Sequence, residues 1–401
     1  MTLQLSRWAL LAVAAAAPVA ALPISLGSLQ VPLTELLLPL AAVSVIIARW
    51  QERSTSPSTP APRQSWPVAL FLTAALLSFL VTEYPRQSLR ELRLLIVEPV
   101  ALYVLLRSIP LDARWTSRAV LAFVCVTAVM ALIAFGLALS GRGLVEAEGV
   151  YRLRGLYPSA NHLALLLGRA LPFSLALALT SASRWPLLAV IAILGLALVA
   201  TFSGGGWMGG AAAVLVVVWL TRGTRMGLGL LALGGVLAAA ALAILRVERI
   251  ASRIDPRRGT AFLRVQLWEA SLAMIRDHPV LGIGLDNFLY RYQQEYLRDE
   301  AAIEPNLSHP HNWVLNFWLS LGVLGLVAAI WLLLEFFAGI REVMLRSSDP
   351  TARALAIGAA GSMTSFLVHG SVDNSYFLPD MALVFWFTLA IPKIVISEPR
   401  P

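Results

Sequence analysis

Long apolar runs separated by short polar segments make up most of this chain. A helix needs about 20 apolar residues to cross the roughly 30 Å hydrocarbon core of a bilayer. Read in this way, the pattern predicts twelve spans, and we expect an all-α polytopic membrane protein with about twelve transmembrane helices. The predicted spans are residues 8–22, 33–48, 66–81, 92–106, 118–139, 160–181, 186–202, 206–221, 226–245, 312–339, 354–369 and 379–396.

One long polar segment, residues 247–310, interrupts this pattern and is too polar to lie in the bilayer. We therefore divide the chain into residues 1–246 with the first nine spans, a loop domain at 247–310, and residues 311–401 with the last three. Apolar residues alternate with charged ones over 261–275, which is typical of an amphipathic helix lying on a membrane. We expect a second such helix at 286–296.

The composition agrees with a membrane protein, because 58% of the residues are hydrophobic and only 13% are charged. The single cysteine, Cys125, excludes an intrachain disulfide and a thiolate metal cluster. The N-terminal run resembles a signal peptide, but the spans that follow favour an uncleaved first helix. The arginines are dispersed between spans, so nucleic acid is not an expected partner.

The distribution of charge predicts the orientation of the chain. With a cytoplasmic N-terminus, the inside loops carry the excess of arginine that the positive-inside rule requires. Both termini are then expected inside, with the 247–310 domain and His311 outside. Arg86, Arg90 and Arg93 lie on the outer side, against this rule. An anionic substrate is one explanation, but we favour an interfacial helix in which Arg90 and Arg93 pair with neighbouring glutamates.

The segment His309-Pro310-His311-Asn312 stands where the polar domain ends and the tenth span begins. An imidazole titrates near neutrality and can take a proton from a hydroxyl, so His311 is a candidate general base. In the alternative interpretation, the segment only ends a loop and Asn312 caps a helix. We interpret His309 as a loop residue. Metal binding by His309, His311 and His369 is not favoured, since no HExxH or Asp-x-Asp pattern is present.

Arginine near or inside the spans indicates anion binding. Arg152 and Arg154 precede the sixth span on the outer side, where two guanidinium groups can bind a diphosphate or pair with Glu146 and Glu148. Arg169 falls inside a predicted span, which marks either a polar cavity or a side chain that reaches the cytoplasmic surface. The glycine-rich run at residues 203–210 favours close helix packing over a nucleotide site.

Four stretches together resemble the O-antigen ligase and O-antigen polymerase superfamily. They are Arg152 to Asn161, Trp268 to Phe288, His311 to Gly325 with Gly322 between, and Val372-Asp373-Asn374. With twelve spans and the long outer loop, the resemblance covers nearly the whole chain. One departure is Gly204, which stands where family members commonly carry an arginine.

The resemblance implies a GT-C-like fold and a metal-independent, inverting glycosyltransferase without a cofactor. The donor would be a glycan linked to undecaprenyl diphosphate, and the acceptor a sugar hydroxyl, of lipid A-core for a ligase. A polymerase extending a glycan and a protein O-oligosaccharyltransferase are alternatives, and a lipid-linked glycan transporter is the alternative outside the enzymes. The expected location is the bacterial inner membrane, with membrane lipid around the spans and the site facing the periplasm.

Within this framework His311 is the predicted catalytic residue, and the remaining site residues are predicted to bind or orient substrate. Arginines can offset the charge of a departing diphosphate without a metal. The substrate-binding candidates are Arg154 and Arg264, then Arg152 and Arg169, for the diphosphate, and Asn161, Asn312 and Asp373 for His311 or sugar hydroxyls.

Overall fold

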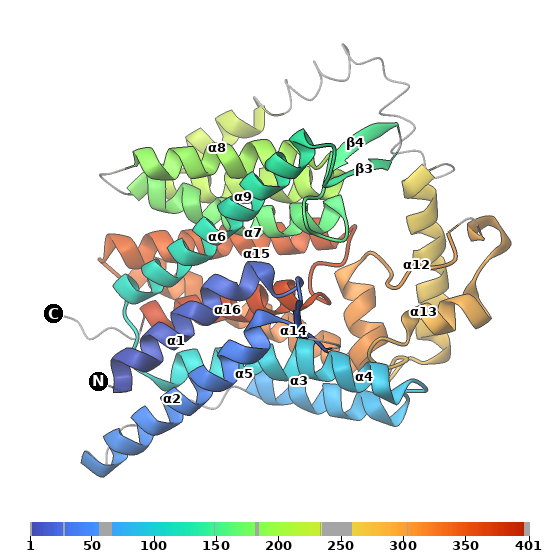
Figure 1. Cartoon of the computed structure of the whole chain (residues 1–401), viewed down its shortest axis with the longest axis horizontal. Coiled ribbons are helices and arrows are strands. Elements are labelled where there is room, and N and C mark those ends of the chain that lie inside the picture. Colours follow the sequence, from blue (N-terminus) through green and yellow to red (C-terminus); the bar gives the residue numbers. More distant parts are fainter. Residues whose placement is uncertain are drawn as a thin grey trace.

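The protein is a bundle of helices with a small helical domain at one end (Figure 1). The computed structural model describes residues 2–26, 29–55, 66–147, 149–180, 184–232, 234, 259–302 and 304–396. The helices are α1 (Thr2–Ala16), α2 (Leu33–Thr55), α3 (Trp66–Leu77), α4 (Pro85–Glu91), α5 (Glu98–Ser108), α6 (Ala113–Leu139), α7 (Ala160–Thr180), α8 (Trp185–Ala200), α9 (Gly204–Arg222), α12 (Gly259–Asp277), α13 (Phe288–Arg291), α14 (Trp313–Arg346), α15 (Pro350–Gly370) and α16 (Pro379–Val395).

Short helical turns and two hairpins complete the described structure. The turns are η1 (Ala17–Val19), η2 (Ser78–Leu80) and η5 (Asp299–Ala301), with π-helical turns at η3 (Leu92–Val97) and η4 (Tyr292–Tyr296). Strand β1 (Ile24–Leu26) pairs with β2 (Leu29–Val31), and β3 (Leu144–Ala147) pairs with β4 (Val150–Leu153), both antiparallel. The sequence analysis did not predict the hairpins.

The expected all-α polytopic fold is confirmed. By length and composition, seven of the described helices can cross a membrane, and the shorter apolar helices at Trp66–Leu80 and Trp185–Ala200 add two. Each predicted span except the ninth coincides with a helix, although α5 and α16 are shorter than a typical span. The ninth span, residues 226–245, lies largely outside the described residues.

Side-chain caps define where several of these helices begin. Asp112, Ser203, Asn312 and Asp349 each precede a helix and accept a hydrogen bond from a first-turn backbone N–H. Such a cap satisfies a donor that has no partner within the helix. The polar residues between the apolar runs therefore set the helix boundaries as well as the loops.

Helices α7, α15 and α16 form the centre of the bundle, since nearly all their side chains are buried. Small residues let α15 approach α7 and α9 closely. A methyl group at Gly358 would overlap Phe173, and one at Gly361 would overlap Pro172 and Val217. By contrast, α2 leaves a row of large apolar side chains exposed, including Leu40 and Ile46, as expected for contact with lipid.

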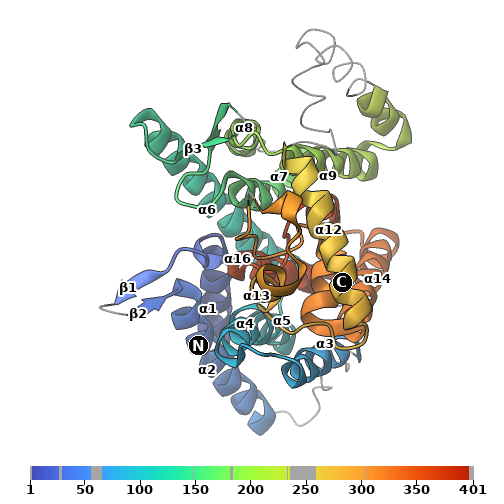
Figure 2. The same ribbon diagram turned by 90° about the vertical axis from the view of Figure 1, so that its right-hand side faces the viewer.

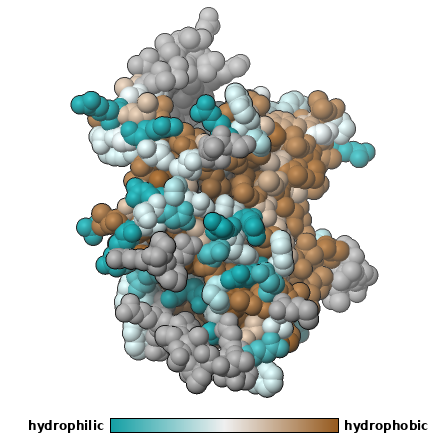
Figure 3. Space-filling model, turned by 90° about the vertical axis from the view of Figure 1, so that its left-hand side faces the viewer, coloured by the Kyte–Doolittle hydropathy of each residue, from teal (hydrophilic) through white to brown (hydrophobic). Residues whose placement is uncertain are grey.

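Both termini lie at one end of the bundle, and the loop domain lies at the other (Figure 1). Figure 2 looks onto the second end, where α12 and α13 stand in front of the bundle helices. Figure 3 looks onto the end that carries the termini. Hydrophilic side chains are spread over that end, and hydrophobic ones gather along one flank. This arrangement agrees with two termini on the same side of a membrane.

The loop domain has a small apolar core of its own. The two helices expected at 261–275 and 286–296 are present as α12 and as α13 with η4. Met274 of α12 and Tyr292 pack with Leu319 of α14, so this core continues into the bundle. The first residues of the predicted domain, 247–258, lie outside the described part of the chain.

A break in α14 fixes the loop domain to the bundle. Gly322 has φ 70° and ψ −177°, a backbone conformation that is essentially restricted to glycine. A methyl group there would lie 2.3 Å from the Val280 carbonyl oxygen, and one at Gly282 would lie 2.3 Å from the Leu319 carbonyl oxygen. Backbone bonds from Ile283 N to Leu319 O (2.7 Å) and from Val323 N to Val280 O (3.0 Å) join the two segments.

Candidate active site

A cavity of about 570 Å³ lies at the loop-domain end of the bundle. Five parts of the chain line it: the segment before α14, the loop between α15 and α16, the start of α7, the α4–η3 turn, and the N-terminal segment up to α2. Its polar lining includes Glu35, Arg90, Arg93, Asn161, His162, His309, His311, Asp373 and Asn374. The bundle thus brings titratable groups from distant parts of the sequence to one space.

His311 is held in place by its neighbours on both sides. Asn312 caps α14 by accepting hydrogen bonds from Val314 N and Leu315 N, and its amide donates to the Ser371 carbonyl (3.0 Å). On the other side, Trp268 of the loop domain donates from Nε1 to the Pro310 carbonyl (3.0 Å). His311 itself has φ 50°, a left-handed conformation that costs a non-glycine residue energy and is concentrated at functional sites.

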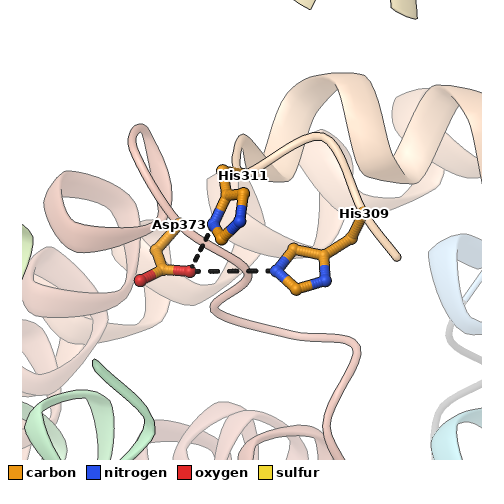
Figure 4. A group of neighbouring side chains, drawn as sticks. All are labelled: His309, His311 and Asp373. Carbon is orange, nitrogen blue, oxygen red and sulfur yellow. Dashed lines mark hydrogen bonds and ion pairs between the residues drawn. The ribbon is translucent and has the colours of Figure 1, made fainter. Parts of the chain in front are cut away.

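The imidazole of His311 is hydrogen-bonded to Asp373. Nδ1 lies 2.9 Å from Asp373 Oδ1 (Figure 4). A carboxylate on Nδ1 fixes the tautomer in which Nδ1 carries the proton and Nε2 is free to accept one. Nε2 of His311 has no hydrogen-bond partner among the described residues. The pair therefore has the arrangement that a general base requires.

Two further histidines surround the same carboxylate. His309 Nε2 lies 3.9 Å from Asp373 Oδ1, and His369 Nε2 lies 3.6 Å from Oδ2. Burial alone would raise the pKa of Asp373, but the hydrogen bond and charge of His311, together with the nearby His309 and His369, lower it well below its usual value. Burial and the neighbouring His311 lower the pKa of His309, against the opposing effect of Asp373. Asp373 is therefore a carboxylate at neutral pH.

His309 has a larger place in the site than the sequence indicated. It is a loop residue, as expected, but it lines the cavity and its ring centroid lies 4.3 Å from that of His311. His309, His311 and Asp373 each offer a ligand atom, and these atoms lie within 4.8 Å of one another. This trio therefore has the geometry of a candidate metal site.

The glycine-rich run packs against the histidine side of the site. A methyl group at Gly205 would lie 2.5 Å from His369 Cδ2, and one at Gly209 would lie 3.1 Å from the Ser365 carbonyl oxygen. The helix-packing interpretation of residues 203–210 therefore describes the contact between α9 and α15. His369 is only 1% exposed, because α9 approaches closely enough to cover it.

A second buried histidine–carboxylate pair lies beside the cavity, and the sequence analysis missed it. His162 Nε2 of α7 is 2.7 Å from Asp380 Oδ2 of α16, and both side chains are buried. Only His162 of the two lines the cavity. A histidine and a carboxylate inside predicted spans were the available signal, since ionisable groups in such positions usually have partners and roles.

None of the four arginines predicted to bind substrate lines the cavity. Arg152 donates to the Thr201 carbonyl (3.0 Å) and to Asn161 Oδ1 (2.5 Å), and Arg154 donates to the Tyr157 carbonyl (3.1 Å). Glu148, a proposed partner of Arg152, lies outside the described residues. Of this group, Asn161 lines the cavity.

Arg169 and Arg264 also stand apart from the cavity. Arg169 is 2% exposed and donates to the Ser362 carbonyl (2.9 Å) and to Thr388 Oγ1 (3.3 Å), with Phe366 against its guanidinium group. It is thus a buried charge that joins α7, α15 and α16, and its side chain does not reach the surface of the bundle. Arg264 lies on α12 and does not line the cavity.

Arg90 and Arg93 are the arginines that line the cavity among the described residues. The sequence analysis had favoured glutamate pairing for them. Arg93 does lie 3.0 Å from Glu35 and 3.9 Å from Glu98, whereas no ion pair is present for Arg90 among the described residues. Their predicted position on the outer side of the membrane, against the positive-inside rule, was the signal for the second interpretation, an anionic substrate.

Comparison with known proteins adds one relationship. A family model described as O-antigen ligase matches residues 187–330, which include α8, α9, the loop domain, His311 and the break at Gly322. Asp373, Arg90 and Arg93 lie outside the matched segment. No curated protein sequence matches the chain.

Proposed function

We propose that the chain belongs to the O-antigen ligase and polymerase superfamily, because the O-antigen ligase family model matches residues 187–330, and that it transfers a glycan from undecaprenyl diphosphate to a hydroxyl group of an acceptor. The observation that carries this proposal is the bond between His311 Nδ1 and Asp373 in a cavity that also contains arginines. A base for the acceptor and cations for the leaving group are the two requirements of such a transfer.

In the proposed reaction, His311 Nε2 takes the proton of the acceptor hydroxyl as its oxygen attacks the anomeric carbon of the donor sugar. The new bond forms on the face opposite the diphosphate, so the configuration at this carbon inverts. The bond to the phosphate oxygen breaks, and undecaprenyl diphosphate leaves with the electron pair. Asp373 accepts the Nδ1 hydrogen bond throughout and stabilises the imidazolium that forms.

The proposed mechanism needs no metal ion or cofactor. The donor already carries a good leaving group, and arginine can stabilise its developing charge. In this mechanism, the trio of His309, His311 and Asp373 serves to accept a proton, with His311 as the base. A metal bound there would compete with this role for His311 and Asp373.

We place the reaction on the periplasmic side of the bacterial inner membrane, in a GT-C-like bundle of about twelve spans. Among the acceptors that the superfamily suggests, we propose the lipid A-core, which would make the protein a ligase. A polymerase would instead lengthen the lipid-linked glycan, a protein O-oligosaccharyltransferase would modify a polypeptide, and a transporter would move the donor without forming any new glycosidic bond.

The proposal is tested with purified protein in proteoliposomes, a lipid-linked donor, and lipid A-core, glycan or protein acceptors. We expect the wild-type protein to form a glycosidic bond, and His311→Ala to lower turnover by about 10²- to 10⁴-fold. His278→Ala is the matched control, because His278 directly follows α12 and does not line the cavity. Normal turnover in His311→Ala would exclude the general base.

Two further arms of the same assay address the metal and the acceptor. Activity should persist in EDTA; loss on chelation with recovery on adding a divalent cation would assign the trio to a metal instead. The acceptor that gains the glycan identifies the ligase, polymerase or protein-transfer reaction. Movement of the donor across the bilayer without any product would identify a transporter.

A further inference from the structure

We propose that Arg90 and Arg93 bind the diphosphate of the lipid-linked donor, and that the groove beside them receives the first units of its isoprenoid chain. This inference rests on the proposed function and adds the phosphate-binding half of its site. No other arginine of the described residues lines the cavity that contains His311 and Asp373.

The two arginines link the cavity to the outer surface of the bundle. Both line the cavity, and both also line a neighbouring groove of about 540 Å³. A diphosphate held between them would therefore have the glycan on the cavity side and the lipid on the groove side. That order along the ligand, namely sugar, diphosphate and hydrocarbon, is the order of a lipid-linked donor.

The groove has the composition expected for a short length of lipid chain. Leu89, Leu92 and Val97 line it together with the arginines. Leu89 is 60% exposed and Val97 is 48% exposed, although both are aliphatic. An exposed apolar strip beside arginines fits an amphiphile with an anionic head, whereas a free nucleotide or inorganic phosphate would leave the strip uncovered.

The acidic neighbours of Arg90 and Arg93 neutralise their positive charge only in part, so both arginines can bind an anion. Arg93 is 54% exposed despite its contacts with Glu35 and Glu98, so part of its guanidinium group is available. Burial raises the pKa of Glu91 to about 7, with a further contribution from Asp286 and an opposing one from Arg90. Near neutral pH, Glu91 is therefore partly protonated and neutralises Arg90 incompletely.

The turn that carries Arg93 is held rigidly against the loop that carries Asp373. The Leu95 carbonyl belongs to the π-helical turn η3, which also carries Arg93. Tyr376 Oη donates to that carbonyl (2.7 Å) and accepts from Trp386 Nε1 (2.9 Å). Tyr376 follows Asp373 by three residues, so a buried hydrogen bond joins the turn that carries Arg93 to the loop that carries Asp373.

Binding of farnesyl diphosphate to the detergent-solubilised full chain tests the site without requiring catalysis. We expect Arg90→Gln and Arg93→Gln each to weaken binding about tenfold or more, because each removes charge-assisted hydrogen bonds. In the transfer assay, the same variants should raise KM for the donor and leave KM for the acceptor unchanged. Arg142→Gln, an exposed arginine at the same end of the bundle, should change neither.

Several outcomes would overturn the inference. Wild-type affinity for farnesyl diphosphate in the double variant excludes the site. Equal losses for farnesyl diphosphate and phosphatidylglycerol would identify a general contact with anionic lipid instead. If removing Arg93 prevents folding by leaving Glu35 and Glu98 unpaired, Arg90→Gln alone decides, since Arg90 has no ion pair among the described residues.

The same data separate this inference from the proposed function. If the wild-type protein transfers no glycan but the variants lose diphosphate binding, the transferase proposal is wrong and the diphosphate site is supported. If the double variant transfers glycan at the wild-type rate with an unchanged donor KM, the diphosphate site is wrong and the transferase proposal is supported.

Discussion

His311 takes a left-handed backbone conformation at the one point where the loop domain, α14 and the α15–α16 loop meet. The strain is maintained by bonds on both flanks, from Trp268 to Pro310 and from Asn312 to Ser371. Asn312 caps α14, as one interpretation of the sequence expected. It also donates a hydrogen bond to the loop of Asp373, which agrees with the expected role in orienting His311. Its amide group is engaged within the protein, so we assign it to positioning and not to a sugar hydroxyl.

At this scale we predict that Asp373→Asn lowers turnover by about a thousandfold or more and leaves donor KM nearly unchanged. An amide can donate to Nδ1 and so favour the wrong imidazole tautomer, as happens when the carboxylate of a catalytic triad is replaced. Steady-state kinetics in proteoliposomes measures both constants. A rise in KM with normal turnover would instead assign Asp373 to substrate binding.

Acid stability gives an independent check on the same variant. The native pKa of Asp373 lies below the 3.8 of a free carboxyl group, so its ionised form stabilises the folded protein above about pH 4. That stabilisation is lost as the pH falls through the native pKa. The difference in Tm between wild type and Asp373→Asn should thus shrink as the pH falls below 4.

Helix α14 is interrupted at Gly322, whose backbone conformation is not helical. Its break at Gly322 opens a space that the segment around Val280 fills, and Gly282 makes the reciprocal close approach. Both glycines belong to the stretches that suggested the superfamily. Their role here is mechanical, since they dock the loop domain, and with it Trp268 and Pro310, onto the helix that begins after His311.

We predict that Gly322→Ala lowers Tm and reduces transfer at least tenfold. The backbone conformation alone costs a residue with a side chain about 1–3 kcal/mol, and overlap with the Val280 carbonyl adds to it. Differential scanning fluorimetry and amide hydrogen exchange of residues 280–283 check this. Gly195→Ala on α8 is the control, because its methyl group meets nothing within 4 Å; unchanged exchange in Gly322→Ala would contradict the docking role.

The whole molecule places the termini at one end and the cavity at the other, as in Figure 1. Arginine distribution predicted that the termini face the cytoplasm. The lipid-exposed faces of helices such as α2 and the buried centre of α7, α15 and α16 are consistent with a multi-pass membrane protein.

The corresponding prediction concerns labelling of single cysteines in a Cys125→Ser background. A membrane-impermeant maleimide should reach Arg142→Cys from the periplasmic side of intact inner membrane. It should reach Arg346→Cys only after the membrane is opened, since Arg346 ends α14 at the opposite end of the bundle. The reverse pattern would invert the proposed orientation and expose the cavity to the cytoplasm.

The sequence by itself determined the helices. Apolar length and polar interruptions control transfer into lipid and helix capping, both of which are local properties, so the spans and the loop-domain helices could be predicted. The sequence also singled out His311 by its place at a membrane boundary, and His311 remains a predicted catalytic residue.

Only the tertiary structure decided which groups meet. His311 and Asp373 are 62 positions apart, and their bond depends on how α14 packs beside α15 and α16. Packing also buried Arg169 among helix partners and brought Arg90 and Arg93 to the cavity. The local sequence shows that an arginine in or near a span needs a partner. Which partner it meets depends on how all the helices pack.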